Sequence, residues 1–180
     1  MMLNDIEQIL ISEEQINQRV KELAQILDKD YEGKNPLMVC ILKGSVLFFS
    51  ELVKRMNVRQ EFDFMSVSSY GASTYSSGKV KLIKDLNSSI EGRHVVLIED
   101  IVDTGHTLSY LKQMLNERKP ASLKVCTLLD KKCRRTVELE ADYYGFDIDD
   151  YFVVGYGLDY DEDYRNLPFV GVLKPEVYKK

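Results

Sequence analysis

The stretch from Val95 to Leu108 constrains the fold most strongly. Its first four residues are apolar and three of them are β-branched, which predicts a strand buried on both faces. Glu99 and Asp100 follow the strand, and the run Asp-Thr-Gly-His-Thr at 103–107 then leads into a helical pattern that begins at Leu108. In an open parallel sheet, such a loop lies at the edge where ligands bind. It presents free backbone N–H groups and the positive end of a helix dipole, and both attract phosphate.

The acidic residues of this stretch need a separate explanation. Carboxylates beside an anion site repel phosphate unless they hold a metal ion or accept hydrogen bonds from sugar hydroxyls. A sugar phosphate satisfies both conditions, with its phosphate on the amides and its hydroxyls on Glu99 and Asp100. The plainer interpretation is a capped helix with solvated carboxylates, but it does not require three acids within five residues. The pattern resembles the signature of the type I phosphoribosyltransferases, which bind phosphoribosyl pyrophosphate (PRPP).

The rest of the chain predicts alternating strands and helices. Ser12 to Gln15 reads as a capping box that opens a helix, and a second helix is expected over Val46–Met56. Strands are expected over 37–42, 61–69, 79–84, 123–129, 150–155 and 169–173. We therefore predict an α/β type I phosphoribosyltransferase fold, with a mainly parallel sheet flanked by helices. It forms a single domain, residues 1–180, with a small hood built from the terminal segments.

Composition excludes several other classes of protein. The net charge is −5 with scattered basic residues, which argues against a general nucleic-acid binder. No apolar run approaches the roughly 20 residues that a membrane span needs, and the first eight residues do not resemble a secretory signal. The three cysteines are odd in number and lack metal-site spacing, so a reducing cytoplasm is expected.

Several other segments carry residues that suit a ligand site. Lys43-Gly44 ends the 37–42 strand and could place backbone amides on a diphosphate, although glycine commonly opens loops. Lys131 follows another strand end, where its neighbours Lys132 and Arg134 are interpreted as solvated. Phe152 is either a core residue or a ring that stacks on a planar base. The segment 68–78 is small and polar, which predicts a mobile loop.

The segment 159–165 is acidic and contains one cation. Asp159 could lie in a solvated turn or help to hold Mg²⁺. Arg165 needs either a neighbouring carboxylate or a substrate phosphate as its partner. The run from Phe152 to Tyr160, together with Leu42-Lys43-Gly44, Ser69-Tyr70 and Leu129-Asp130-Lys131, is similar to the hypoxanthine-guanine phosphoribosyltransferase family. One departure is Tyr151, where some members carry lysine, and this suggests the bacterial type.

The resemblance implies a role for each matching residue. Asp103 is the general base near N7 of the purine. Lys131 donates to the 6-oxo group, Phe152 stacks on the base, and the Val153 backbone reads its edge. Residues for PRPP and its phosphates are Lys43, Gly44, Glu99, Asp100, Asp103, Thr104, Gly105, His106, Thr107 and Arg165. Glu99, Asp100 and Asp159 are the expected Mg²⁺ ligands, and Asp159 also lies at the purine site. Ser69 and Tyr70 open a loop that closes over the site.

The implied reaction converts hypoxanthine or guanine plus PRPP to IMP or GMP plus pyrophosphate. The resemblance also implies Mg²⁺ as the cofactor and a homo-oligomer, either a dimer or a tetramer, with no nucleic-acid or membrane partner. Two alternatives remain at this stage. One is a PRPP-sensing regulator on the same fold that binds nucleic acid, and the other is an enzyme for another base such as xanthine. A receiver-type phosphoacceptor does not need Gly105 and its flanking threonines after the acids.

Overall fold

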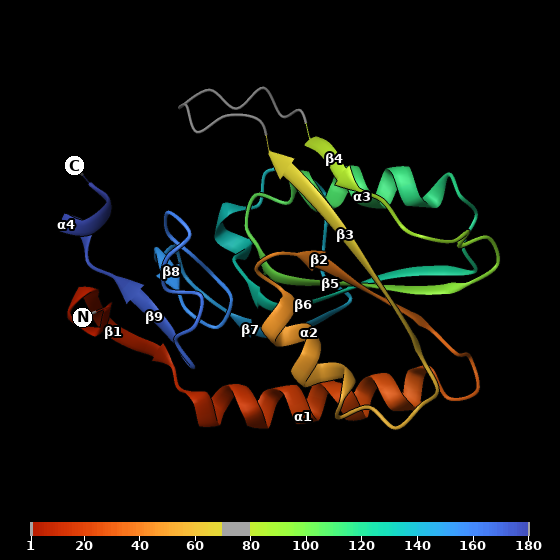
Figure 1. Ribbon diagram of the computed structural model, residues 1–180, viewed down its shortest axis with the longest axis horizontal. Helices are drawn as coiled ribbons and strands as arrows, with labels where there is room; N and C mark the ends of the chain where they lie inside the picture. Colours follow the sequence, from red (N-terminus) through yellow and green to blue (C-terminus); the bar gives the residue numbers. More distant parts are fainter. Residues whose placement is uncertain (1, 70–79, 180) are drawn as a thin grey trace.

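The computed structural model describes residues 2–69 and 80–179, and its centre is a six-stranded sheet (Figure 1). The strand order is β4-β3-β2-β5-β6-β7, and only β4 runs antiparallel to its neighbour. The strands are β2 (Leu37–Leu42), β3 (Glu61–Ser69), β4 (Val80–Lys84), β5 (His94–Val102), β6 (Ser122–Asp130) and β7 (Tyr143–Asp147). The prediction of an α/β fold with a mainly parallel sheet is confirmed.

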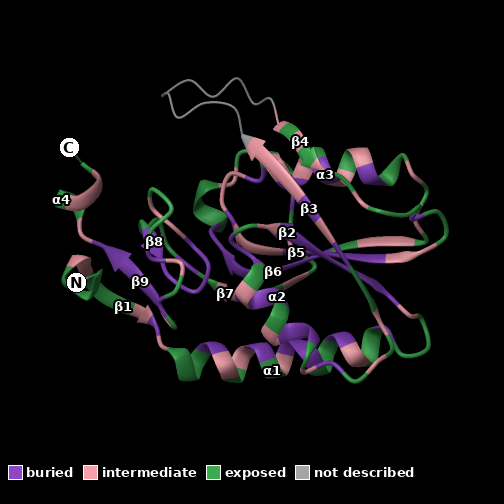
Figure 2. Ribbon diagram, in the orientation of Figure 1, coloured by how far each residue is buried: buried purple, intermediate pink, exposed green. Residues whose placement is uncertain are grey.

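Helices cover both faces of this sheet. Helix α1 (Glu13–Asp30) and helix α2 (Val46–Val53) lie on one face, and α3 (His106–Asn116) lies on the other (Figure 1). The expected capping box at Ser12 is present, since its hydroxyl accepts from the Gln15 N–H and the Gln15 side chain accepts from the Ser12 N–H. The buried residues of α1 belong to one core cluster with residues of β2 and β5. Figure 2 shows buried and exposed residues interspersed along this helix.

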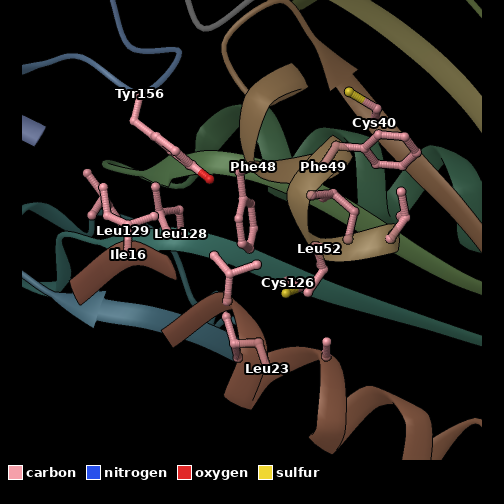
Figure 3. Packing of buried hydrophobic residues seen from close by; sticks show 14 of the residues in the cluster. Ile16, Leu23, Cys40, Phe48, Phe49, Leu52, Cys126, Leu128, Leu129 and Tyr156 are labelled. Carbon is pink, nitrogen blue, oxygen red and sulfur yellow. The ribbon is translucent and has the colours of Figure 1, made fainter. Parts of the chain in front are cut away.

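The central strands supply the core because they are apolar on both faces. Val96 and Ile98 of β5 pack with α1 and α2, whereas Val95 and Leu97 pack with α3. Figure 3 shows the cluster on the α1 side, where Phe48 of α2 lies between the sheet and α1. The buried four-residue run that identified the strand in the sequence therefore joins two separate clusters.

A second sheet of three antiparallel strands lies at one end of the molecule (Figure 1). Its order is β1-β9-β8, with β1 (Ile6–Ile11), β9 (Val170–Leu173) and β8 (Val153–Val154). Its flanks are the 3₁₀ helix η1 (Met2–Asp5) and the short helix α4 (Pro175–Tyr178). The segments near both ends of the chain thus build it together. We keep the single domain 1–180, with these segments as its hood, as a proposal.

Some element bounds differ from those expected. Helix α2 ends at Val53 rather than Met56, and only Val153 and Val154 of the segment 150–155 form a strand. Strands β1 and β7, helix α4 and the 3₁₀ helix η2 (Lys132–Arg134) have no counterpart in the sequence predictions. No helix in the described ranges 2–69 and 80–179 has the length and apolar character needed to cross a bilayer.

Candidate active site

The predicted site residues gather where three parallel strands end. Strands β2, β5 and β6 are neighbours in register, so Leu42, Val102 and Asp130 terminate at one edge of the sheet. The segments that follow these three strands carry Lys43 and Gly44, the run Asp103 to Thr107, and Lys131. A site at the carboxyl edge of a parallel sheet is therefore built from segments that are distant in sequence.

The loop after β5 forms a candidate anion site at the start of α3. Gly105 has φ +89°, and a Cβ there would lie 2.9 Å from side-chain atoms of Arg135 and Val137. Only glycine fits this turn without strain. The first N–H groups of α3 have no partner within the helix. They border a hollow of about 110 Å³ lined by Glu99, Ile101, Val102, Asp103, Thr104, Gly105, Thr107 and Leu108. Its size and its amides suit one phosphate group.

His106 is the exception in this loop. Its Nε2 atom lies 2.9 Å from the Thr136 hydroxyl, and its side chain does not line the hollow. The Thr136 N–H also donates to the Thr104 carbonyl at 3.1 Å. Thr136 therefore ties the loop to the segment after β6, and the expected contact of His106 with phosphate would come from its backbone.

Arg135 supports the same loop and is a residue that the sequence reasoning missed. Its guanidinium donates to the backbone carbonyls of Val102, Asp103 and Leu139, and it pairs with the buried Asp130 carboxylate. The Arg135 side chain is only 13% exposed. A guanidinium has five N–H donors in a planar fork, which suits this set of acceptors. The only sequence signal was a second arginine in the charged run 130–135.

Glu99 and Asp100 lie within β5, so the prediction that the strand ends before them is wrong. The ladder with β6 continues to the pair Val102–Asp130, because β6 offers pairing partners up to that point. Burial raises the pKa of Glu99 well above its usual range, and the neighbouring Asp100 carboxylate raises it further. Burial also raises the pKa of Asp100, although the Ile101 N–H donates to it at 2.7 Å. A cation or sugar hydroxyls would relieve this cost.

Gly44 brings the loop after β2 against the acidic pair. A Cβ on Gly44 would lie 1.7 Å from Asp100 Oδ2, and a Cβ on Gly157 would lie 1.9 Å from the Gly44 carbonyl oxygen. The backbone of the 43–44 turn is therefore in close contact with a candidate metal ligand on one side and with the 155–158 segment on the other. The Leu42–Lys43 peptide bond in this turn is cis.

Arg165, which contacts the 155–158 segment, and Lys43, in the 43–44 turn, both have their charges already paired. Arg165 donates to the Gly157 carbonyl at 2.7 Å and lies 2.9 Å from Asp159 Oδ1, while Lys43 Nζ lies 2.9 Å from Glu162 Oε2. Arg165 Nε is buried and has no hydrogen-bond partner among the described residues. The Glu162 N–H donates to Asp159 Oδ2 at 2.9 Å. An anionic ligand here would compete with these carboxylates for the two cations.

A larger hollow of about 400 Å³ opens beside the anion site. Its lining residues are Ile101, Asp103, Lys131, Arg134, Asp150, Tyr151, Phe152, Val153, Leu158 and Tyr178. Lys131 is 6% exposed, and its ammonium donates to the Tyr151 carbonyl at 2.8 Å and lies 3.7 Å from Asp150. This hollow combines an aromatic ring, apolar walls and a buried cation, which suits a planar molecule with a carbonyl group.

Asp103 and Ile101 line both hollows, so they mark the boundary between the anion site and the planar pocket. The Asp103 Oδ1 atom is buried and makes no well-aligned hydrogen bond, although Arg134 Nε lies 3.3 Å from it. Arg134 also pairs with Asp150 at 3.3 Å, and the Asp103 carboxylate is the main cause that raises the pKa of Arg134. Arg134 is half exposed, as expected for a solvated side chain, and it forms ion pairs with both carboxylates.

Two further predictions concern a metal site and a mobile loop. In residues 2–69 and 80–179, no group of three or more His, Cys, Asp or Glu side chains is placed to hold a metal ion. Mg²⁺ needs fewer, since it is commonly held by one or two carboxylates plus substrate phosphates. Tyr70 and most of the expected loop 68–78 lie outside the described residues, and Ser69 is described only as the end of β3.

A further hollow, of about 800 Å³, lies elsewhere. It is near the end of α1 and is lined by Asp28, Lys29, Glu32, Gly33, Asn35, Asn57, Val58 and Arg59. Asp28 already accepts hydrogen bonds from the Asn57 backbone, the Asn57 amide and the Val58 backbone. It contains none of the predicted site residues. The chemistry therefore points to the two smaller hollows at the sheet edge.

Comparisons with known proteins show which family the chain resembles. A family model described as the phosphoribosyl transferase domain matches residues 7–161. The chain is 57% identical over all 180 residues of both chains to hypoxanthine-guanine phosphoribosyltransferase of Streptococcus thermophilus. It is 54% identical over 179 residues, 99% of each chain, to the enzyme of that name from Bacillus subtilis. A crystal structure of a hypoxanthine phosphoribosyltransferase from Staphylococcus aureus superposes with a TM-score of 0.96 at 53% identity, covering 99% of this chain and 97% of that one.

Proposed function

The chain belongs to the phosphoribosyl transferase domain family, and from this premise we propose that it is a purine salvage enzyme. It converts hypoxanthine or guanine plus PRPP to IMP or GMP plus pyrophosphate. The relatives that match along the full chain carry the name hypoxanthine-guanine phosphoribosyltransferase. That agreement does not favour a PRPP-sensing regulator or an enzyme for another base.

The observation that carries the proposal is the pair of adjoining hollows. The smaller one suits a phosphate, the larger one suits a planar base, and both share Asp103 and Ile101. A ribose 5′-phosphate bound in the small hollow would place its C1 carbon toward the larger one. The bond between ribose and base would then form next to the Asp103 carboxylate.

We assign the general base to Asp103. In the reaction a purine nitrogen attacks C1, the C1–O bond to pyrophosphate breaks, and the purine loses a proton. A carboxylate at this boundary can accept that proton. Arg134, at 3.3 Å, is the cation nearest to the Asp103 carboxylate among the ion pairs of the described residues.

In the proposed site, the leaving group, pyrophosphate, binds against the turn after β2. Backbone groups of Lys43 and Gly44 and the Arg165 guanidinium are the proposed contacts for pyrophosphate. Glu99 and Asp100 fit a Mg²⁺ role, since burial and mutual repulsion disfavour two unneutralised carboxylates there. Asp159 is the proposed third ligand, although Arg165 and the Glu162 N–H already contact both of its oxygens. When bound, Mg²⁺ would supply positive charge against the developing diphosphate.

The larger hollow is the proposed binding site of the purine base. The Lys131 ammonium is a donor with no acceptor capacity, so it suits the 6-oxo oxygen of hypoxanthine or guanine. Phe152 supplies a stacking face, and the Val153 backbone lies next to it in the lining. Adenine presents an amino group at the same position, which leaves the buried cation without an acceptor from the base.

Location and assembly are also proposals. Cys40 and Cys126 are free and buried, which suits a protein of the reducing cytoplasm. A homo-oligomer is also proposed, and Phe62 on β3 and Ile83 on β4, both more than half exposed, are candidate contacts between copies.

A direct assay tests the function. The purified protein is incubated with PRPP, Mg²⁺ and one base at a time, and the products are separated by chromatography. IMP and GMP are expected from hypoxanthine and guanine, with stoichiometric pyrophosphate. Omission of Mg²⁺ with a chelator should abolish product. Absence of nucleotide from every purine would contradict the proposal.

A further inference from the structure

The Phe152 ring, which is proposed to stack on the base, is not fixed in orientation by its own segment of the chain. Residues 151 and 152 precede the two-residue strand β8 and belong to no strand, and the Phe152 side chain is 39% exposed. Its backbone carbonyl accepts from the Leu173 N–H at 2.9 Å, which fixes the main chain but not the ring. A ring that must stack on a ligand needs side-chain packing to hold its orientation.

Two tyrosine rings provide that packing. The Tyr178 ring stacks on Phe152, with a centroid distance of 4.3 Å and an interplanar angle of 12°. The Tyr160 ring meets it edge-on, with a centroid distance of 5.7 Å and an interplanar angle of 80°. Both arrangements are favourable for aromatic pairs. Tyr178 also lines the 400 Å³ hollow, which it does not fill.

Helix α4 holds Tyr178 at this position. Pro175 begins the helix, and the Lys179 N–H donates to its carbonyl at 2.8 Å. Lys174 is tied to the segment before β1, since its N–H donates to the Asp5 carbonyl and its ammonium donates to the Asn4 carbonyl. Val177 and Tyr178 pack with the apolar cluster of the second sheet. Figure 1 shows α4 following β9 at the end of the molecule that holds β1 and β8.

We propose that Tyr178 is a positioning residue of the purine site, which fixes the Phe152 ring by covering one of its faces. The proposal requires the base to use the other face of Phe152 within the 400 Å³ hollow. This inference rests on the proposed function. It adds Tyr178 of α4 to the residues that recognise the base. Tyr178 acts through Phe152 and does not contribute to PRPP binding.

Kinetics of Tyr178 variants test this role. Tyr178→Ala should raise KM for hypoxanthine about threefold to tenfold, the range that one aromatic pair is worth. KM for PRPP and kcat should stay within about twofold, because the anion site does not contact Tyr178. Tyr178→Phe keeps the ring and should behave like wild type. Tyr110→Ala, which removes an exposed tyrosine of α3, is the matched control.

A fluorescence measurement gives an independent readout that can be made even when a variant has little enzymatic activity. The chain has no tryptophan, so Tyr178→Trp introduces a single reporter. Saturating GMP should change its emission, whereas the same addition to a Tyr110→Trp variant should not.

Three kinetic results would overturn the proposal while wild type is active. They are an unchanged KM for hypoxanthine in Tyr178→Ala, an equal rise in KM for PRPP, or a lower KM for hypoxanthine, which would mean that Tyr178 covers the face that the base needs. Silent emission from Tyr178→Trp would also overturn it. A wild-type protein that makes no nucleotide would instead contradict the proposed function.

Discussion

Asp103 is the residue on which the proposed chemistry depends most. It borders both the anion hollow and the base pocket, and its buried Oδ1 atom makes no well-aligned hydrogen bond. Asp103→Asn keeps the shape of the side chain but cannot accept a proton. We expect kcat to fall by roughly 10²-fold or more while PRPP still binds.

The measurement for this variant is steady-state kinetics together with calorimetry of PRPP binding. Asp147→Asn is a suitable control, because that carboxylate is exposed and pairs only with Lys132 among the ion pairs of the described residues. Near-normal turnover in Asp103→Asn would assign the base to another residue.

At the residue scale, the sequence predicts well which side chains line the site. It predicts less well which contacts hold each side chain in place. Lys131, Phe152 and Asp103 line one pocket, as the resemblance implies. Arg135 was not predicted as a loop support, because its acceptors are backbone carbonyls whose positions no residue pattern encodes. Tyr178 was missed because a four-residue helix carries too little periodicity to be recognised.

Among the elements, the turn between β2 and α2 makes the tightest contact with the acidic pair. A Cβ on Gly44 would lie 1.7 Å from Asp100 Oδ2, so Gly44→Ala must displace that carboxylate or the turn. We expect KM for PRPP to rise by about tenfold or more, because small misplacements of binding groups are costly. KM for hypoxanthine should change much less.

Gly92→Ala is the matched glycine control for this experiment. A Cβ there meets nothing within 4 Å, so the substitution carries only the strain of its φ of +71°. It should lower the free energy of unfolding by about 1 kcal/mol and leave both KM values unchanged. If Gly44→Ala had the kinetics of Gly92→Ala, the assigned contact between this turn and PRPP would be wrong.

The elements that sequence patterns predicted are those with long apolar or amphipathic runs. Strand β2 and helix α1 match their expected starts because a run of six apolar residues, five of them buried, and a capping box identify them. Strand β5 is longer than expected because its pairing with β6 continues through polar residues. Strands β1 and β7 were missed because half-exposed edge strands carry weak hydrophobic patterns.

Across the whole molecule, the packed core holds several titratable groups in their neutral form. Tyr31 is 3% exposed, and burial raises its pKa to about 12. Burial likewise raises the pKa of the Cys40 thiol to about 11. Above pH 10 the unfolded chain releases the Tyr31 proton while the native protein keeps it. Stability must therefore fall as pH rises from 10 toward 12.

Urea denaturation at pH 8, 9, 10 and 11 measures this effect. Tyr31 alone should lower the free energy of unfolding by about 1.4 kcal/mol between pH 9 and pH 11. Tyr31→Phe should show a correspondingly flatter decline, whereas Tyr110→Phe should follow wild type. Parallel curves for wild type and Tyr31→Phe would mean that Tyr31 ionises as readily in the folded protein as in the unfolded chain.

The central claim is that the two hollows bind PRPP and a 6-oxopurine, and base selectivity tests it most directly. We would measure kcat/KM for hypoxanthine, guanine and adenine at saturating PRPP and Mg²⁺. Lys131 is buried and donates, so adenine leaves it without an acceptor from the base, and discrimination of roughly 10⁴-fold is attainable from such unmet bonds. We predict comparable values for hypoxanthine and guanine and a value for adenine lower by at least about 10³-fold. Adenine within tenfold of hypoxanthine would contradict the role of Lys131 and the account of the base pocket.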